Sequence, residues 1–187
     1  MGRGHIESLE IVDGVKVVAA ADPAPESLMA TKAVCGGIQL YEDYRQMLQA
    51  ETLDAVVVAT PNDTHADIVC DVLGAGIHVL GEKPVANSLE GCNRIADAVL
   101  RSDRVFQVGL ECRYAAIHQR MRALIKEGRM GRIRQLWCKS FRGPWELKVD
   151  QWIIKQSRSG GTLVEKNVTI LIYSTGSPMK IRLRSRA

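Results

Sequence analysis

Apolar runs that end at turn-forming residues alternate with amphipathic stretches along the first half of the chain. Residues Val15–Asp22 and Leu53–Thr60 are almost uninterrupted apolar, β-branched runs, which is the pattern of strands buried on both faces. Shorter runs of the same kind predict three more strands, at Ile38–Tyr41, Ile77–Leu80 and Val105–Val108.

The stretches between these runs carry the periodicity and the end signals of helices. We expect helices over Ala24–Val34, Tyr44–Ala50, His65–Gly76 and Ser88–Arg101. Strands that alternate with helices through short connections predict an α/β fold with a parallel, doubly wound sheet.

The rhythm changes after Gly109, where we place a domain boundary. A longer amphipathic helix is expected over Ile117–Glu127, followed by a strand over Ile133–Phe141. Residues Arg142–Gly161 mix tryptophan, glycine, proline and charged residues without a period, which predicts a loop. Its tryptophans are compatible with the wall of a pocket and equally with simple packing.

Composition narrows the class of protein. The chain has 187 residues, 46% of them hydrophobic, with charges of both signs, as in globular domains. No apolar run reaches the roughly 20 residues of a membrane helix and no signal peptide is recognisable, so we expect a cytoplasmic protein without membrane contact. The five cysteines form no C-x-x-C pair, which predicts reduced core thiols and no metal site.

The net charge of +4 raises the question of a nucleic-acid partner. Much of the excess positive charge lies at the extreme C-terminus, in Lys180, Arg182, Arg184 and Arg186. Without this tail the chain is close to neutral, so we expect no nucleic acid and rank this function last.

Four segments, in order, carry a family resemblance: DAVVVATPNDTH, HVLGEKPVANS, VGLECRY and LIKEGRMGRIRQL. Together they resemble the Gfo/Idh/MocA family of NAD(P)-dependent oxidoreductases, from residue 1 to about residue 168. The E-K-P signature after a strand is the most specific element. The resemblance implies a Rossmann domain over residues 1–109 and a partial substrate and oligomerisation domain over 110–187. It also implies a sugar, inositol or related polyol as substrate, and homo-oligomers of the complete form.

The resemblance implies NAD as the cofactor, with NADP as the alternative. The segment that starts at Gly2 resembles the end of the G-x-G-x-x-G turn, so Gly2 would be its third glycine, and we expect the first Rossmann strand to be missing. Asp22 follows about 20 residues later, the offset of an acid that binds the adenosine ribose. The other interpretation of Asp22 is a cap of the turn at Pro23.

Lys83 is the residue that we expect to be catalytic. Pro84 disfavours a helical conformation at Lys83, which places it at the carboxyl edge of a sheet, where open α/β folds bind ligands. An amine there can hold a substrate hydroxyl and take part in proton transfer, and the family gives this lysine such a role. An isolated lysine would otherwise be a solvated surface charge.

The resemblance implies further contacts with the nicotinamide half of the cofactor. The contacts come from the T-P-N-x-x-H turn and from the E-K-P segment. The residues concerned are Thr60, Pro61, Asn62, His65, Glu82 and Lys83. His65 early in a helix is also compatible with a capping or packing role. Arg113 and Tyr114 fall at the domain junction, where the family has residues that face the substrate; Arg113 is equally compatible with a salt bridge.

Relatives continue from a G-G-x-L-x-[DE] segment into an H-x-x-D helix, whereas here GGTLVEKNV leads into TILIYSTGSP. We expect residues 169–187 to be a frameshifted tail; the alternative is that TILIYS is a true strand. A missing first strand would leave a gap in the sheet, so we expect little turnover from this chain. The competing hypothesis is a non-catalytic protein that uses a nucleotide-binding fold for binding or assembly.

Overall fold

The structure is a computed structural model that describes residues 1–135 and 149–167. Its strands form two parallel sheets. In one, β1 (Ala19–Ala21) pairs with β2 (Gln39–Tyr41). In the other, the order is β3 (Ala55–Val58), β4 (His78–Glu82), β5 (Phe106–Gly109). The α/β class and the parallel arrangement predicted from the sequence are confirmed.

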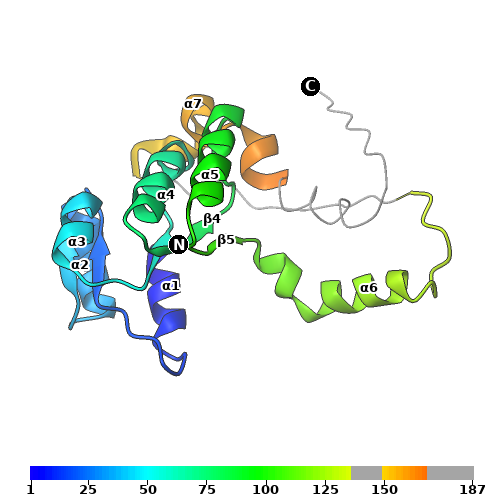
Figure 1. Ribbon diagram of the computed structural model, residues 1–187, viewed down its shortest axis with the longest axis horizontal. Helices are drawn as coiled ribbons and strands as arrows, with labels where there is room; N and C mark the ends of the chain where they lie inside the picture. Colours follow the sequence, from blue (N-terminus) through cyan, green and yellow to red (C-terminus); the bar gives the residue numbers. More distant parts are fainter. Residues whose placement is uncertain (136–148, 168–187) are drawn as a thin grey trace.

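Helices connect the strands, as the alternation predicts. Before β5 they are α1 (Gly2–Leu9), α2 (Pro25–Val34), α3 (Tyr44–Ala50), α4 (His65–Gly74) and α5 (Leu89–Arg101). After β5 come α6 (Ala116–Lys126) and α7 (Gln156–Ser159). Single turns complete the described part of the chain: η1 (Asn62–Thr64), η2 (Glu111–Tyr114), η3 (Val149–Ile154) and η4 (Leu163–Asn167). Figure 1 shows α4 and α5 on one face of the three-stranded sheet and α1 on the other, which makes the sheet doubly wound.

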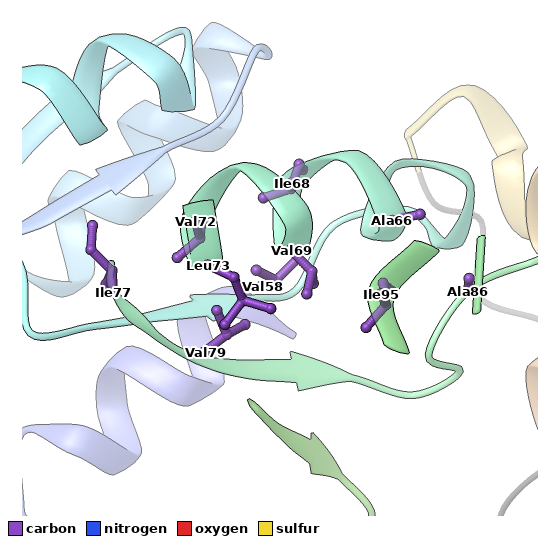
Figure 2. Close-up of a cluster of buried hydrophobic side chains, with 10 residues drawn as sticks. All are labelled: Val58, Ala66, Ile68, Val69, Val72, Leu73, Ile77, Val79, Ala86 and Ile95. Atoms are coloured by element: carbon purple, nitrogen blue, oxygen red, sulfur yellow. The ribbon is translucent and has the colours of Figure 1, made fainter. Parts of the chain in front are cut away.

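The hydrophobic core lies between α4, α5 and the three-stranded sheet (Figure 2). Val58 of β3 and Val79 of β4 are each 2% exposed, and Val72 of α4 is completely buried. Apolar residues three and four positions apart give α4 a continuous apolar face, which packs on the strands. Ile95 of α5 closes the cluster at 2% exposure.

The start of α5 fixes the segment that follows β4. Ser88 accepts a hydrogen bond at its Oγ from the backbone N–H of Gly91, at 3.0 Å, and so caps the helix. A Cβ at Gly91 would lie 2.9 Å from the Cβ of Ala86 and 3.3 Å from that of Ala66. Only glycine allows α5 to approach α4 this closely, and the approach holds residues 83–87 against the start of α4.

The strands are shorter than the sequence indicates. An extended strand was expected over Val15–Asp22, but only Ala19–Ala21 pair with a neighbour. Within the described residues, β1 pairs only with β2 and β3 only with β4, so each has one edge without a ladder. The two sheets share no strand pairing, whereas the sequence analysis expected one sheet with a gap.

Beyond β5 the chain departs from the layered core. Helix α6 has no buried residue and extends away from the sheets (Figure 1). Residues 133–135 are not in a strand, and the rest of the strand expected over Ile133–Phe141 lies outside the described residues, as does the segment 169–187. The expected loop before Gly161 instead contains the helical turns η3 and α7, with Trp152 buried. None of the described helices has the length and apolarity needed to cross a bilayer.

Candidate functional site

Three strands bring their carboxyl ends to one edge of the three-stranded sheet. The register pairs Val58 with Gly81 and Glu82 with Gly109, so the chain leaves β3, β4 and β5 at nearly the same level. Parallel strands of an open α/β sheet bind ligands at this edge. The turns that follow β3 and β4 carry Asn62 and Lys83, and the first of these turns is stabilised by a hydrogen bond from Thr64 N–H to Pro61 O at 2.9 Å.

Lys83 contacts an acid from a distant part of the chain. Its Nζ donates to the backbone oxygen of Glu165 at 3.0 Å and to the Oε1 of the same residue at 3.2 Å. The two side chains are only 18% and 6% exposed. The pair is therefore shielded from water. In such a buried place, a charge that lost its partner would be costly. The Lys83–Pro84 peptide is cis.

Asn62 completes this cluster. The side chain is 2% exposed, and its Nδ2 donates to Oε2 of Glu165 at 2.7 Å and to the backbone oxygen of Ser159 at 2.8 Å. Both carboxylate oxygens of Glu165 thus accept a hydrogen bond, one from Lys83 and one from Asn62. An amine held by a fixed carboxylate at the sheet edge is an arrangement that can exchange a proton with a hydroxyl group.

His65 connects the turn after β3 with the turn after β4. It is 1% exposed, with Nδ1 at 2.8 Å from the oxygen of Pro84 and Nε2 at 3.0 Å from the oxygen of Thr60. The structure thus places His65 inside the core, with both ring nitrogens in contact with backbone carbonyl groups. Thr60 also contacts the hydroxyl of Thr64, at 2.8 Å.

Glu82 lies on the other side of the strand end. Its Oε1 is 2.8 Å from Nε2 of His5 on α1, and its Oε2 accepts from the backbone N–H of Lys83 at 3.2 Å. These residues border a pocket of about 330 Å³. Its lining comes from α1, β4, β5 and η2, and includes His5, Leu80, Glu82, Gly109 and Tyr114. The pocket adjoins Glu82 but not the Lys83 side chain.

The residues expected at the adenosine end lie on separate elements. Gly2 is the first residue of α1 and is exposed. Asp22 follows β1, and its Oδ1 accepts from the backbone N–H of Ala24 at 2.9 Å. This hydrogen bond is the capping contact that the sequence analysis left open beside ribose binding. It engages one oxygen of the carboxylate and is compatible with either role.

The residues expected to face the substrate lie on η2. Tyr114 is 64% exposed, lines the pocket, and accepts at its hydroxyl from Nε2 of Gln107 at 2.9 Å. Arg113 is exposed on the same turn. The structure therefore brings Thr60, Asn62, His65, Glu82 and Lys83 together, but places Gly2, Asp22 and Arg113 outside that cluster.

Sequence reasoning missed Glu165. The G-G-x-L-x-[DE] pattern contains it, four residues after Gly161, but the sequence analysis used this segment only to locate the end of the resemblance. The acid of that pattern, which follows shortly after two glycines that favour a turn, was the available signal. Within the described residues, no group of three or more His, Cys, Asp or Glu side chains could hold a metal ion.

Comparison with known proteins gives matches over most of the described chain. The model of an oxidoreductase family with an NAD-binding Rossmann fold, Gfo/Idh/MocA, matches residues 1–110. The inositol 2-dehydrogenase of Streptomyces avermitilis is 34% identical over 140 residues, which are 74% of this chain and 41% of that protein. The chain thus spans less than half the length of this curated relative.

Two solved structures extend the likeness to three dimensions. The WlbA dehydrogenase from Bordetella pertussis, in complex with NADH and UDP-GlcNAcA, has a TM-score of 0.66 and 31% identity, over 70% of this chain and 40% of that one. A scyllo-inositol dehydrogenase from Lactobacillus casei, with bound NAD(H) and scyllo-inositol, has a TM-score of 0.66 and 26% identity. That match covers 70% of this chain and 39% of the other.

Proposed function

The chain belongs to the Gfo/Idh/MocA oxidoreductase family, and on this basis we propose that it provides the cofactor-binding part of a dehydrogenase for a sugar, inositol or related polyol. The observation that carries the proposal is the shielded contact of Lys83 with Glu165 at the carboxyl edge of the sheet. The relatives support it, since they include an inositol 2-dehydrogenase and a dehydrogenase solved with a nucleotide sugar.

The described residues fit a dinucleotide at two places. The first turn of α1 has no acidic residue and no side-chain cap, so its N–H groups suit an anion such as a pyrophosphate. Asp22 ends β1 and presents a carboxylate to a ribose hydroxyl. No arginine follows Asp22 closely, which favours NAD over NADP. Thr60, Pro61 and Glu82 would border the nicotinamide half.

The proposed chemistry assigns each polar group of the cluster a separate task. Bound NAD supplies the acceptor or donor of the hydride. Lys83 holds the substrate hydroxyl through Nζ and stabilises the negative charge that develops on oxygen as the C–H bond breaks. The hydroxyl proton passes to the pair of Lys83 and Glu165. Asn62 keeps the Glu165 carboxylate in place, and Arg113 and Tyr114 would face the substrate from η2.

We also propose that the chain is divided into two domains near Gly109. Residues 1–109 would be the nucleotide-binding domain, because β5 ends at Gly109 and, after the turn η2, α6 leaves the layered core. Residues from 110 onwards would belong to the substrate domain, which in the complete form would also pair subunits. The docking of Glu165 against Lys83 is one of the contacts that join these two parts.

A titration tests the cofactor assignment. We would titrate NAD, then NADP, into the chain by calorimetry, and repeat both with Asp22→Ala and with Asp13→Ala, an exposed acid before β1. NAD should bind, Asp22→Ala should weaken it about tenfold through loss of a ribose hydrogen bond to a charged group, and Asp13→Ala should match the wild type. Absence of NAD binding would rule out the proposal. Binding without oxidation of any inositol or sugar would favour the non-catalytic alternative.

A further inference from the structure

Two asparagine side chains cap the end of α7. Its last carbonyl groups have no partner within the helix. Asn87, from the segment after β4, donates through Nδ2 to the oxygens of Ser157 at 2.9 Å and Arg158 at 3.3 Å. Asn62, from the turn after β3, donates to the oxygen of Ser159 at 2.8 Å. Three consecutive carbonyl groups are thus held by the two turns that surround Lys83.

An ion pair fixes the same helix from its side. Nε of Arg158 lies 2.8 Å from Oδ2 of Asp63, and the two side chains are 28% and 27% exposed. A second acid, Asp150, is 3.9 Å from Nη1 of Arg158. The other oxygen of Asp63 is buried and has no hydrogen-bond partner among the described residues. Asp63 therefore depends on Arg158 for its neutralisation.

A tight turn links this helix to Glu165. Gly160 and Gly161 both have positive φ, +80° and +84°, a conformation that side chains disfavour. A Cβ at Gly160 would also lie 2.8 Å from Cγ1 of Val164 and 3.1 Å from the oxygen of Asn87. The backbone has little conformational freedom between α7 and Glu165. The position of α7 therefore determines where the Glu165 carboxylate lies.

We propose that Asn87 and Arg158 are positioning residues, which hold residues 155–165, the docked segment, on the turns after β3 and β4 and so set the contact of Glu165 with Lys83. The inference deepens the proposed function, on which it rests for the role of Lys83. Neither residue touches the Lys83 amine. Asn87 holds backbone oxygens of α7, and Arg158 holds α7 through its ion pair with Asp63. Release of the docked segment would expose the amine to water and remove its carboxylate partner.

Acylation of lysine amines measures this directly. A short pulse of acetic anhydride converts accessible, unprotonated amines to amides with release of acetate, and peptide mass spectrometry reports each lysine separately. In the whole chain, Lys83 should be acylated more slowly than Lys126, an exposed lysine of α6. Arg158→Ala and Asn87→Ala should each raise the rate at Lys83 about fivefold, as expected for the loss of one modest interaction, and leave Lys126 unchanged.

The chain offers a matched control. Arg94 and Asp67 form an ion pair with a 2.7 Å contact between α5 and α4, away from the docked segment. Arg94→Ala removes an arginine of the same kind and should leave the rate at Lys83 unchanged. An equal rise in Arg94→Ala would mean that general loosening exposes Lys83, and would overturn the inference.

Charge reversal separates positioning from loss of folding. The double variant Asp63→Arg, Arg158→Asp restores an ion pair with the same partners and should return Lys83 to near the wild-type rate. Failure of this rescue, or an unchanged rate in Arg158→Ala, would overturn the inference. Because acylation needs neither cofactor nor substrate, these results are independent of whether the chain binds NAD or oxidises a polyol.

Discussion

Nζ of Lys83 lies 3.2 Å from Oε1 of Glu165, although the two residues are 82 positions apart in the sequence. The contact is largely removed from water, so each charge depends on the other. Removal of one partner from a shielded pair typically costs about 3 kcal/mol, whereas replacement of both by neutral groups costs much less. The pair is thus a link between two distant parts of the chain and a point of vulnerability.

A double-mutant cycle tests this dependence. Lys83→Met and Glu165→Gln should each lower the free energy of unfolding by about 3 kcal/mol, because each removes one partner from a shielded ion pair. The double variant should lose less than the sum of the two, with a coupling of about 0.5–3 kcal/mol. Urea unfolding followed by circular dichroism gives all four values. Strict additivity would show that the two groups do not interact in solution.

Turnover tests the catalytic assignment of Lys83. With NAD and an inositol, or another polyol that the chain oxidises even slowly, Lys83→Met should lower kcat by about 100-fold or more, the usual contribution of general acid–base catalysis. Lys126→Met removes an exposed lysine and should keep the wild-type kcat. Formation of NADH followed by fluorescence provides the measurement. Equal turnover in Lys83→Met and wild type would remove Lys83 from the mechanism.

The core makes a prediction about stability alone. Ile95 is 2% exposed and packs α5 on the sheet, so Ile95→Ala should destabilise the chain by about 2–5 kcal/mol through lost burial and a residual cavity. Leu100, on the same helix, is 84% exposed. Leu100→Ala should change stability by less than about 0.5 kcal/mol. Chemical unfolding of both variants checks the contrast, and similar losses would contradict the packing described for α5.

Tyr44 contributes to the pH dependence of stability in the alkaline range. Burial, and then its 2.6 Å hydrogen bond to Asp71, raise the pKa of Tyr44 well above its usual value of 10.0. A raised pKa in the folded state gives stability that is full below the unfolded pKa and is lost as the pH rises beyond it. Tyr44→Phe should therefore show a shallower fall of Tm above pH ~10.

The matched control for this pH dependence is Tyr114→Phe, which removes a phenol that is 64% exposed. Its melting temperature should fall with pH as steeply as that of the wild type. Melting curves recorded by circular dichroism at several alkaline pH values would compare the three proteins. If Tyr44→Phe kept the full alkaline slope, the Tyr44–Asp71 hydrogen bond would not contribute to stability.

Patterns of neighbouring residues predict those features of the fold that neighbouring residues determine, such as the position of a strand or the start of a helix. The apolar run at Leu53–Thr60, followed by Pro61, predicts both β3 and the start of the next helix, and Pro84 predicts that Lys83 lies at a strand end. Val15–Val18 were assigned to a strand and are not in one, because strand length depends on a neighbouring strand as well as on side chains. Periodicity reports only one segment at a time.

The site itself was predictable only in part. Lys83, Asn62 and His65 lie on two adjacent turns, and the motifs around them identify these turns from the sequence. Their contacts with Glu165 and with the backbone of α7 join positions far apart in the chain, and no local pattern encodes such a pairing. The burial of His65 between two carbonyl groups likewise follows from the packing of α4 against the segment after β4.

The separation of the two sheets has a consequence for how the molecule opens. Within the described chain, β1–β2 and β3–β4–β5 share no ladder, so no strand-to-strand hydrogen bonds connect the two sheets. The first sheet is built from two strands of three residues each, while the second carries the buried cluster. Fluctuations that expose the amides of β1 and β2 can therefore occur while the larger sheet stays closed. The region that would receive the adenosine is thus held by fewer interactions than the larger sheet, and a bound nucleotide would add order there.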